Sequence, residues 1–178
     1  LKEYGCNAIR CSHNPPSPEF LDMCDRLGFV VIDEVYDKWK TVGYFWGYYT
    51  KYFDEWWKRD LDAMILRDRN HPSVILWSIG NETDEQNDLT GAGTSLAKML
   101  QDYIHMIEPT RPVSAVIAPG DVLKRPYNEN GFTEVLDIVG DNYQEPWLSK
   151  EKKRFPDRIM YIAEAFPYYL SRHNSIRD

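Results

Sequence analysis

The sequence predicts an α/β fold in which parallel strands alternate with helices. Short apolar runs rich in β-branched residues recur along the chain, separated by longer helical or loop stretches, which is the pattern of βα units. Several of these runs are almost continuously apolar, as expected for strands that are covered on both faces. No internal repeat, low-complexity tract or linker divides the 178 residues, so the chain reads as one domain.

Six strands are predicted, at residues 7–12, 29–33, 74–79, 112–116, 138–142 and 159–163. A (β/α)8 barrel typically has eight strands and ~250 residues. The chain therefore fits either an open α/β sheet or a barrel that lacks its first and last strands. Because it begins without Met, in what reads as the end of a helix, we expect a fragment of a longer protein.

The clearest predicted helix lies between the first two strands. Ser17 is a suitable N-cap, a proline follows it at the first helical position, and Gly28 comes directly after the last apolar position. Two further helices are predicted at residues 54–70 and 96–108, where apolar residues recur at helical spacing and a proline follows. Residues 35–52 form a long aromatic loop, and loops of that length are usually functional or disordered.

Composition and charge argue against several classes of partner. A net charge of −7 without runs of Lys or Arg provides no basic surface for nucleic acid. No apolar run approaches the ~20 residues of a membrane span, and the first residues lack the features of a signal peptide. Cys6, Cys11 and Cys24 show no CxxC spacing, so neither a disulfide framework nor a zinc site is predicted. We expect no nucleic-acid or membrane partner; a periplasmic, secreted or cytoplasmic location and the oligomeric state are left open.

Polar residues at the strand ends form a candidate site. In parallel α/β folds the ligand lies outside the carboxyl ends of the strands. The residues at those ends are Arg10, Ser12, His13, Asn14, Asp33, Glu34, Asn81, Glu82, Asp141, Asn142, Tyr143 and Glu164. Asn70, His71 and Asp157 lie at the amino ends instead, so His71 is interpreted as structural. His105 and His173 are interpreted in the same way, because no matching ligand surrounds either of them.

Two carboxylates of this set, Glu82 and Glu164, each directly follow a strand that looks buried. In retaining glycoside hydrolysis one carboxylate attacks the anomeric carbon and the other protonates the leaving oxygen, from about 5–5.5 Å apart. At that separation their mutual repulsion raises one pKa, which keeps one acid protonated near neutral pH. A single Glu after a strand is more commonly a solvated loop carboxylate or a helix-cap partner. The sequence around each Glu is therefore needed to distinguish a catalytic from a structural role.

Four segments carry the longest motifs of the chain, namely residues 7–16 (NAIRCSHNPP), 27–34 (LGFVVIDE), 67–82 (RDRNHPSVILWSIGNE) and 161–167 (YIAEAFP). In amino-acid sequence, order and spacing these motifs resemble those of the catalytic barrel of glycoside hydrolase family 2, and they resemble its β-galactosidase branch most. The resemblance implies an incomplete (β/α)8 TIM barrel, with residues 1–178 as a single catalytic-barrel fragment without its flanking β-sandwich domains. We expect this fragment to be inactive in isolation, and turnover of a nitrophenyl β-galactoside by it would contradict that.

The resemblance also implies roles for individual residues. Glu82 matches the general acid/base, Glu164 the nucleophile, and Asn81 the residue that holds the sugar 2-hydroxyl. Arg10 and Tyr143 match positions beside the nucleophile, where they keep its carboxylate ionised and oriented. An ion pair inside the barrel is the alternative for Arg10. Family members commonly carry Ser before the nucleophile and Thr or Ser after it, where this chain has alanines; neither side chain is required for the attack.

Further positions near the site have weaker support. His13 matches a histidine that faces the substrate, with a cap for the following turn as the alternative. Asp33 is expected to contact sugar hydroxyls, whereas Glu34 is interpreted as a loop carboxylate without a role. Trp39 and Trp46 are candidates for a sugar platform, with packing within their own loop as the alternative.

The expected function is that of a retaining exo-β-glycosidase, an O-glycosyl hydrolase acting on terminal β-D-galactosides. β-Glucuronidase and β-mannosidase are the near alternatives, and the absence of a convincing Asn-x-Lys motif after Glu164 argues against the former. A non-catalytic carbohydrate-binding barrel remnant and an unrelated open α/β domain are the alternatives of other classes. A carbohydrate is the expected partner, and no cofactor is expected. No compact acidic metal motif is present, so metal dependence is left open.

Overall fold

A six-stranded parallel sheet frames the molecule in the computed structural model, which describes residues 1–40, 49–118 and 126–166. Each strand pairs with its neighbours along the chain, in the order β1-β2-β3-β4-β5-β6. The strands are β1 Ala8–Arg10, β2 Val30–Glu34, β3 Val74–Asn81, β4 Val113–Ile117, β5 Ile138–Asn142 and β6 Met160–Glu164. All six predicted strands are confirmed, each to within two residues at either end.

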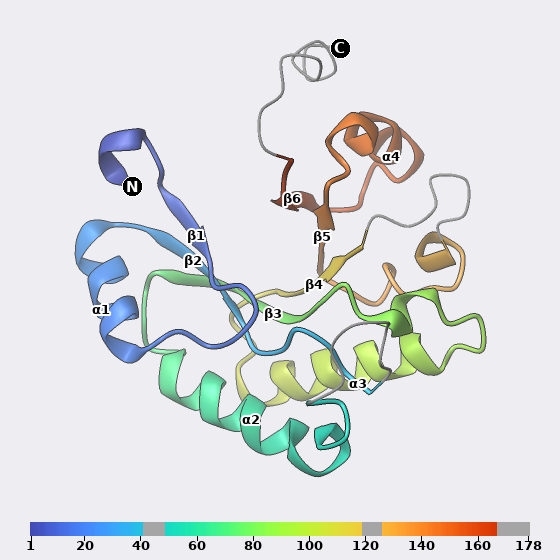
Figure 1. Cartoon of the computed structure of the whole chain (residues 1–178), viewed down its shortest axis with the longest axis horizontal. Helices are drawn as coiled ribbons and strands as arrows, with labels where there is room; N and C mark the ends of the chain where they lie inside the picture. The colour runs from blue at the N-terminus through green and yellow to red at the C-terminus, as the bar shows by residue number, and fades with distance from the viewer. Residues whose placement is uncertain (41–48, 119–125, 167–178) are drawn as a thin grey trace.

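The sheet curls, with β1 and β6 as its two edges, and helices cover its outer face (Figure 1). The helices are α1 Pro18–Leu27, α2 Phe53–Asp68, α3 Ala92–Ile107 and α4 Leu148–Arg154, and the short 3-10 turns are η1 Lys2–Tyr4, η2 Asp84–Asn87, η3 Pro126–Asn128 and η4 Glu145–Trp147. This arrangement is an incomplete (β/α)8 barrel, in which the carboxyl ends of all six strands lie at the same rim. None of the helices that the structure describes has the length and apolarity to cross a membrane.

Helix α1 begins and ends as the sequence predicts. The Ser17 hydroxyl accepts a hydrogen bond from the backbone N–H of Phe20 at 3.4 Å, which caps the first turn. Gly28 ends the helix in the left-handed region, with φ 67°, and its N–H donates to the carbonyl of Cys24. Helix α2 also agrees closely with its predicted range.

Helices α3 and α4 differ from the prediction. Helix α3 starts at Ala92, four residues early, because the Asp88 carboxylate accepts from the backbone N–H groups of Thr90 and Gly93 at 3.0 and 2.9 Å. The glycine-rich sequence there gives no helical signal of its own. Helix α4 was not predicted, since its seven mostly charged residues contain no buried side chain and no apolar period.

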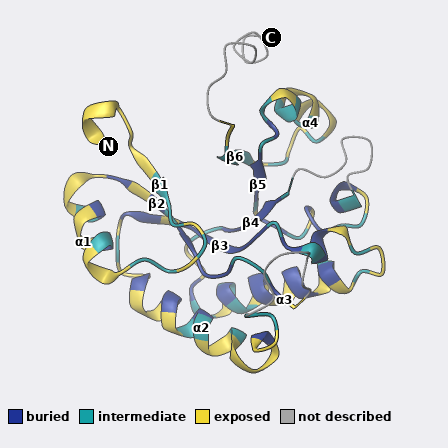
Figure 2. Ribbon diagram, in the orientation of Figure 1, coloured by how far each residue is buried: buried dark blue, intermediate teal, exposed yellow. Residues whose placement is uncertain are grey.

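The hydrophobic core lies between the sheet and helices α1, α2 and α3, where buried positions concentrate (Figure 2). Leu21 of α1, Leu61 and Ile65 of α2, and Val31 and Trp77 of the sheet are fully buried in it. Strand β3 is buried along almost its whole length, which explains its nearly continuous apolar sequence. The core therefore holds the strands from outside and leaves their inward-facing side chains to the candidate site.

Candidate active site

Two irregular strand ends build the centre of the site. The β3–β4 register shifts after Ser78 and the β5–β6 register shifts after Asp141, and such irregularities are over-represented next to active sites. Each is followed by a non-glycine residue with a positive φ, Glu82 at 48° and Tyr143 at 56°. These are the only two such residues in the described part of the chain. Backbone strain of this kind persists where the surrounding structure holds it in place, and functional sites are its usual location.

Arg10, at the end of β1, lies at the centre of a polar cluster on the inner side of the sheet. Its guanidinium donates to both carboxylate oxygens of Glu34 at 2.9–3.1 Å, to Oε1 of Glu164 at 3.0 Å and to Oδ1 of Asn81 at 2.9 Å. Burial alone lowers the pKa of Arg10, but the charge of Glu34 and the hydrogen bonds to Glu164 and Glu34 raise it above its ordinary value. Arg10 is therefore a fixed cation, and the expected ion pair inside the barrel and the expected position beside Glu164 both exist.

Glu164, the last residue of β6, is held as an anion. Tyr143 donates its phenolic O–H to Oε2 at 2.5 Å, and Arg10 donates to Oε1. Burial by itself raises the pKa of Glu164, but these two hydrogen bonds and the Arg10 charge outweigh it, so the pKa lies below its ordinary value. An ionised, oriented carboxylate is what a nucleophile at this position needs.

His13 belongs to the same cluster. Its Nδ1 lies 2.8 Å from Oε1 of Glu34, and its Nε2 lies 3.6 Å from Oε1 of Glu164. The hydrogen bond with Glu34 raises the pKa of His13 against the opposing effect of burial. His13 thus contacts carboxylates at the strand ends, which disfavours the alternative that it caps the turn after it.

Glu82 is held differently from Glu164. Asn142 donates from Nδ2 to Oε1 of Glu82 at 2.9 Å and to Oδ1 of Asn81 at 3.1 Å. Within the part of the chain that the structure describes, no cationic side chain pairs with the Glu82 carboxylate. The adjacent residues Asn142 and Tyr143 therefore contact one glutamate each and bring both to the same rim of the sheet.

Asn81 connects the two glutamates. Its Oδ1 accepts from Arg10, which also binds Glu164, and from Asn142, which also binds Glu82. Its Nδ2 donates to Oδ1 of Asp37 at 3.2 Å. Since an amide nitrogen carries two N–H donors and its carbonyl oxygen two lone pairs, the described residues leave one N–H of Asn81 for a ligand.

The two adjacent acidic residues of β2 have the reverse of their expected roles. Asp33 is fully buried, and burial followed by the nearby charge of Asp68 on α2 raises its pKa to about 8. The expectation that Asp33 contacts sugar hydroxyls is wrong, because its side chain faces the helices. Glu34, interpreted as a loop carboxylate, instead accepts hydrogen bonds from Arg10 and His13 in the cluster. Successive side chains of a strand point to opposite faces, so only one of the two can reach the site.

Trp39 is part of the core and not a sugar platform. It is fully buried, lies against Phe132 with ring centroids 5.9 Å apart, and donates its indole N–H to the carbonyl of Ile79 at 2.6 Å. A Cβ added at Gly80 would meet the indole nitrogen at 2.8 Å, so the close approach of this ring requires glycine there. The platform expectation for Trp39 is therefore wrong, and Trp46 lies outside the described residues.

Several residues of the site had no predicted role. Glu34 and Asn142 stood at the carboxyl ends of strands, which was the signal available for them. Asp37 and Lys38 lie beyond β2 in a segment without a motif, yet Lys38 Nζ donates to the backbone carbonyls of residues 81 and 82 at 2.9 and 2.7 Å. Nothing local in the sequence indicates a contact across more than forty residues.

The histidines away from the rim connect structural elements. His71 Nδ1 lies 2.7 Å from a carboxylate oxygen of Asp25 in α1, and His105 Nε2 lies 2.8 Å from a carboxylate oxygen of Asp137, which precedes β5. These contacts agree with the structural interpretation of both. His173 lies outside the described residues.

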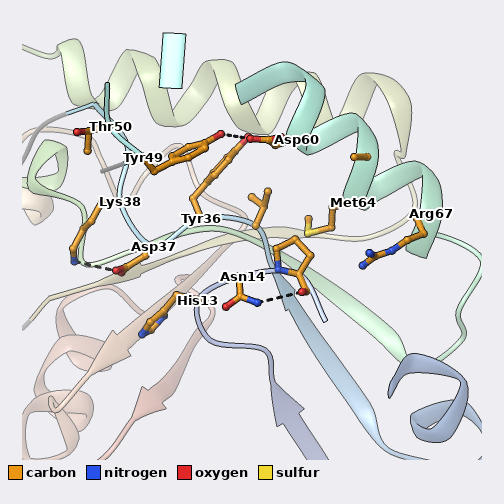
Figure 3. Close-up of a pocket in the computed structure, with 13 residues that line it drawn as sticks. His13, Asn14, Tyr36, Asp37, Lys38, Tyr49, Thr50, Asp60, Met64 and Arg67 are labelled. Carbon is orange, nitrogen blue, oxygen red and sulfur yellow. Dashed lines mark hydrogen bonds and ion pairs between the residues drawn. The ribbon is translucent and has the colours of Figure 1, made fainter. Parts of the chain in front are cut away.

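A pocket of about 500 Å³ adjoins the cluster (Figure 3). His13, Asp37 and Lys38 line one side of it, and the stacked rings of Tyr36 and Tyr49, with centroids 5.5 Å apart, line another. Neither strand-end glutamate lines this pocket. It therefore lies beside the polar cluster and meets it through His13 and Lys38.

The two strand-end glutamates of the cluster have different neighbours. Glu164 is paired with a cation and a phenol that lower its pKa, whereas Glu82 is contacted by the neutral amide of Asn142. The side chains of Asn142 and Asn81 are hydrogen-bonded to each other beside them. The surroundings of the two carboxylates therefore differ in charge.

The chain resembles proteins of known families over nearly its full length. Residues 1–154 match the family described as glycosyl hydrolases family 2, TIM barrel domain. A β-galactosidase of Bacteroides ovatus is 39% identical over 203 residues, which covers 97% of this chain and 23% of that protein. A putative β-glucuronidase of Formosa agariphila is 51% identical over 154 residues, covering 85% of this chain and 14% of that protein.

Solved structures show the same likeness. A glycosyl hydrolase family 2 member from Bacteroides cellulosilyticus matches with a TM-score of 0.82 and 41% identity, covering 93% of this chain and 20% of that chain. The β-glucuronidase of Bacteroides uniformis matches with a TM-score of 0.71 and 28% identity, covering 89% and 20%. The chain thus spans less than a quarter of the length of each of these four relatives.

Proposed function

Because this chain belongs to glycosyl hydrolase family 2, as part of its TIM barrel domain, we propose that the protein carrying it is a retaining exo-β-glycosidase that hydrolyses terminal β-D-galactosides. The observation that supports this most is the unequal pair of strand-end glutamates. Glu164 is kept ionised by Tyr143 and Arg10, while Glu82 is held by Asn142 without a cation among the described residues.

The proposed reaction is a double displacement. In the first step a Glu164 oxygen bonds to the anomeric carbon while the glycosidic bond breaks, and the Glu82 carboxyl gives its proton to the leaving oxygen. In the second step the Glu82 carboxylate takes a proton from water, whose oxygen attacks the anomeric carbon and displaces Glu164. Two inversions return the sugar in its original β configuration, and both glutamates regain their starting protonation states.

Asn81 supports the same reaction by binding the sugar. Both lone pairs of its Oδ1 are occupied, by Arg10 and Asn142, and one N–H of Nδ2 is occupied by Asp37. In the proposed complex its remaining N–H therefore donates to the sugar 2-hydroxyl. That contact strengthens in the transition state and lowers the barrier to forming it.

The choice of a neutral sugar rests on the state of the local cations. A glucuronide needs a cation for its carboxylate. Arg10 is already paired with Glu34 and Glu164, and Lys38 already donates to two backbone carbonyls. Among the described residues this favours galactosidase over glucuronidase activity. The β-glucuronidase named among the relatives keeps that activity as the second candidate, and β-mannosidase is a third.

The proposal includes no cofactor, since two carboxylates and water suffice for both steps. Metal dependence is tested by assaying the protein after dialysis against a chelator. Unchanged turnover agrees with the proposal, and recovery only on adding a divalent cation contradicts this part of it.

The function is tested on the protein that carries this chain, with aryl β-galactoside, β-glucuronide and β-mannoside as substrates. We expect the β-galactoside to be hydrolysed fastest; a faster β-glucuronide would instead support the second candidate. A fluoro-sugar that traps the glycosyl-enzyme should label Glu164. Labelling of another residue contradicts the assigned nucleophile. Binding of sugars without turnover or labelling would favour a carbohydrate-binding remnant.

A further inference from the structure

We propose that Lys38 is a positioning residue for the acid/base Glu82, acting through the backbone of the turn that carries it. This inference rests on the proposed function, because it concerns the same reaction. Lys38 contacts neither the Glu82 carboxylate nor any other charged group of the cluster around Arg10. Its ammonium is instead directed at the peptide groups of the strand end.

The contact is a clamp on two consecutive carbonyl groups. Lys38 Nζ donates to the carbonyl of Asn81 at 2.9 Å and to the carbonyl of Glu82 at 2.7 Å. It also lies 3.6 Å from Oδ1 of Asp37, an ion pair drawn in Figure 3. Two of the three N–H donors of the ammonium group are thus directed at carbonyls, and the Asp37 carboxylate pairs with it at a longer distance. Hydrogen bonds from a charged donor are shorter and stronger than neutral ones, so this side chain holds both peptide planes firmly.

The neighbouring Asp37 completes the clamp. Its carbonyl accepts the backbone N–H of Asn81 at 2.9 Å, and its carboxylate accepts from the Asn81 side chain at 3.2 Å. Residues 37 and 38 therefore make four hydrogen bonds to residues 81 and 82. Together they connect the end of β2 to the end of β3 at the position where the regular strand pairing stops.

The hydrogen bonds of this clamp stabilise an unfavourable backbone conformation at Glu82. Its φ of 48° lies in the left-handed region, which residues other than glycine adopt rarely and at a cost. The carboxylate has one hydrogen bond from the described residues, from Asn142, so the backbone sets most of its direction. Release of the two carbonyls would let Glu82 turn away from the leaving oxygen.

The structure offers close controls for Lys38. Lys40 lies two residues along, and its ammonium pairs with Asp54 while 46% of its side chain is exposed, compared with 21% for Lys38. A Lys40→Met substitution therefore removes a nearby charge without touching the clamp. A Lys38→Arg substitution keeps the positive charge and several N–H donors at this position.

The test measures how the loss in rate depends on the leaving group. Dinitrophenolate leaves without a proton, whereas methanol needs one from Glu82. In the protein that carries this chain, Lys38→Met should lower kcat/KM for the methyl glycoside by about 30-fold or more, within the range of general acid catalysis, and for the dinitrophenyl glycoside by less than about threefold. Added azide should restore kcat for the dinitrophenyl glycoside, since it attacks the glycosyl-enzyme without a general base.

The possible results distinguish a failure of the role proposed for Lys38 from a failure of the proposed function. Lys38→Arg should retain most of the methyl-glycoside activity, and Lys40→Met should match the wild type on both substrates within about twofold. Equal losses on both substrates, or no loss, would overturn the positioning role. A kcat/KM for the dinitrophenyl glycoside that falls by less than about threefold also shows that the variant is folded. Failure of the proposed function would appear in the wild type itself, whereas failure of this inference appears only in the ratio between the two substrates.

Discussion

The two strand-end glutamates are held by different means, and the difference matches the two roles proposed for them. Glu164 is contacted on its carboxylate, by a cation and a phenol that lower its pKa. Glu82 is held through its backbone by Lys38, and its carboxylate meets only the amide of Asn142 among the described residues. A cation on its oxygens favours the ionised form of a carboxylate, whereas a carboxyl that donates a proton is better matched by a neutral partner. The backbone contacts from Lys38 hold the Glu82 turn without pairing a cation with its carboxylate among the described residues.

The largest expected effect comes from removing the glutamates themselves. Glu164→Gln should reduce kcat/KM by about 10⁴-fold or more for every substrate, because no attacking group remains. Glu82→Gln should reduce it by about 10²–10⁴-fold for a methyl glycoside and only slightly for a dinitrophenyl glycoside. Steady-state kinetics with both substrates measure this difference. The same leaving-group dependence in both variants would contradict the assigned division of roles.

A smaller loss is expected at Glu34, the buried partner of Arg10 and His13. Glu34→Gln should lower kcat/KM by about 10²-fold for substrates with good and with poor leaving groups alike. Without the Glu34 carboxylate Arg10 is no longer held in place, and Arg10 orients the proposed nucleophile Glu164, which both kinds of substrate need. Asp33→Asn is the matched control, one residue away on the opposite face, and should leave kcat/KM within about twofold. If the two variants lose activity equally, Glu34 has no special part in the site.

Tyr143→Phe tests the phenol alone. Loss of one hydrogen bond to a charged group should lower kcat/KM by about tenfold. The bond lowers the pKa of Glu164, so its removal raises that pKa, and the acidic limb of the pH profile of kcat/KM should move to higher pH. A limb that stays in place or moves to lower pH would show that Tyr143 does not help to ionise Glu164.

The smallest effect concerns stability and not the reaction. The pKa of Asp33 rises to about 8, above the ordinary value of about 3.9, so its contribution to stability is full below about pH 4 and is lost as the pH rises through 8. Asp33→Asn mimics the protonated acid, and should raise the melting temperature by a few degrees at pH 8 but little at pH 5. Thermal unfolding of both proteins at the two pH values measures this. Asp22→Asn, on the exposed face of α1, should show no such pH dependence.

Much of the fold was predictable because its signals are local. Ser17, Pro18 and Gly28 bound α1 by capping chemistry alone, and apolar runs between turn residues mark all six strands. Sequential pairing of the strands then places every carboxyl end at one rim, which brought Arg10 and Tyr143 into contact with Glu164 as expected. The early start of α3 was not predictable, because its cap is a carboxylate supplied from outside the helical pattern.

The sequence by itself determined the strands, the first helix and the presence of Glu82 and Glu164 at strand ends. Only the tertiary structure decided which of the two adjacent residues Asp33 and Glu34 faces the site. Strand β2 is apolar before Asp33 and Glu34, so no alternation shows which side each occupies, and a shift of one residue would exchange them. The burial of Trp39 and the contact of Lys38 with the Glu82 turn were likewise decided by packing between segments some forty residues apart, which no local pattern encodes.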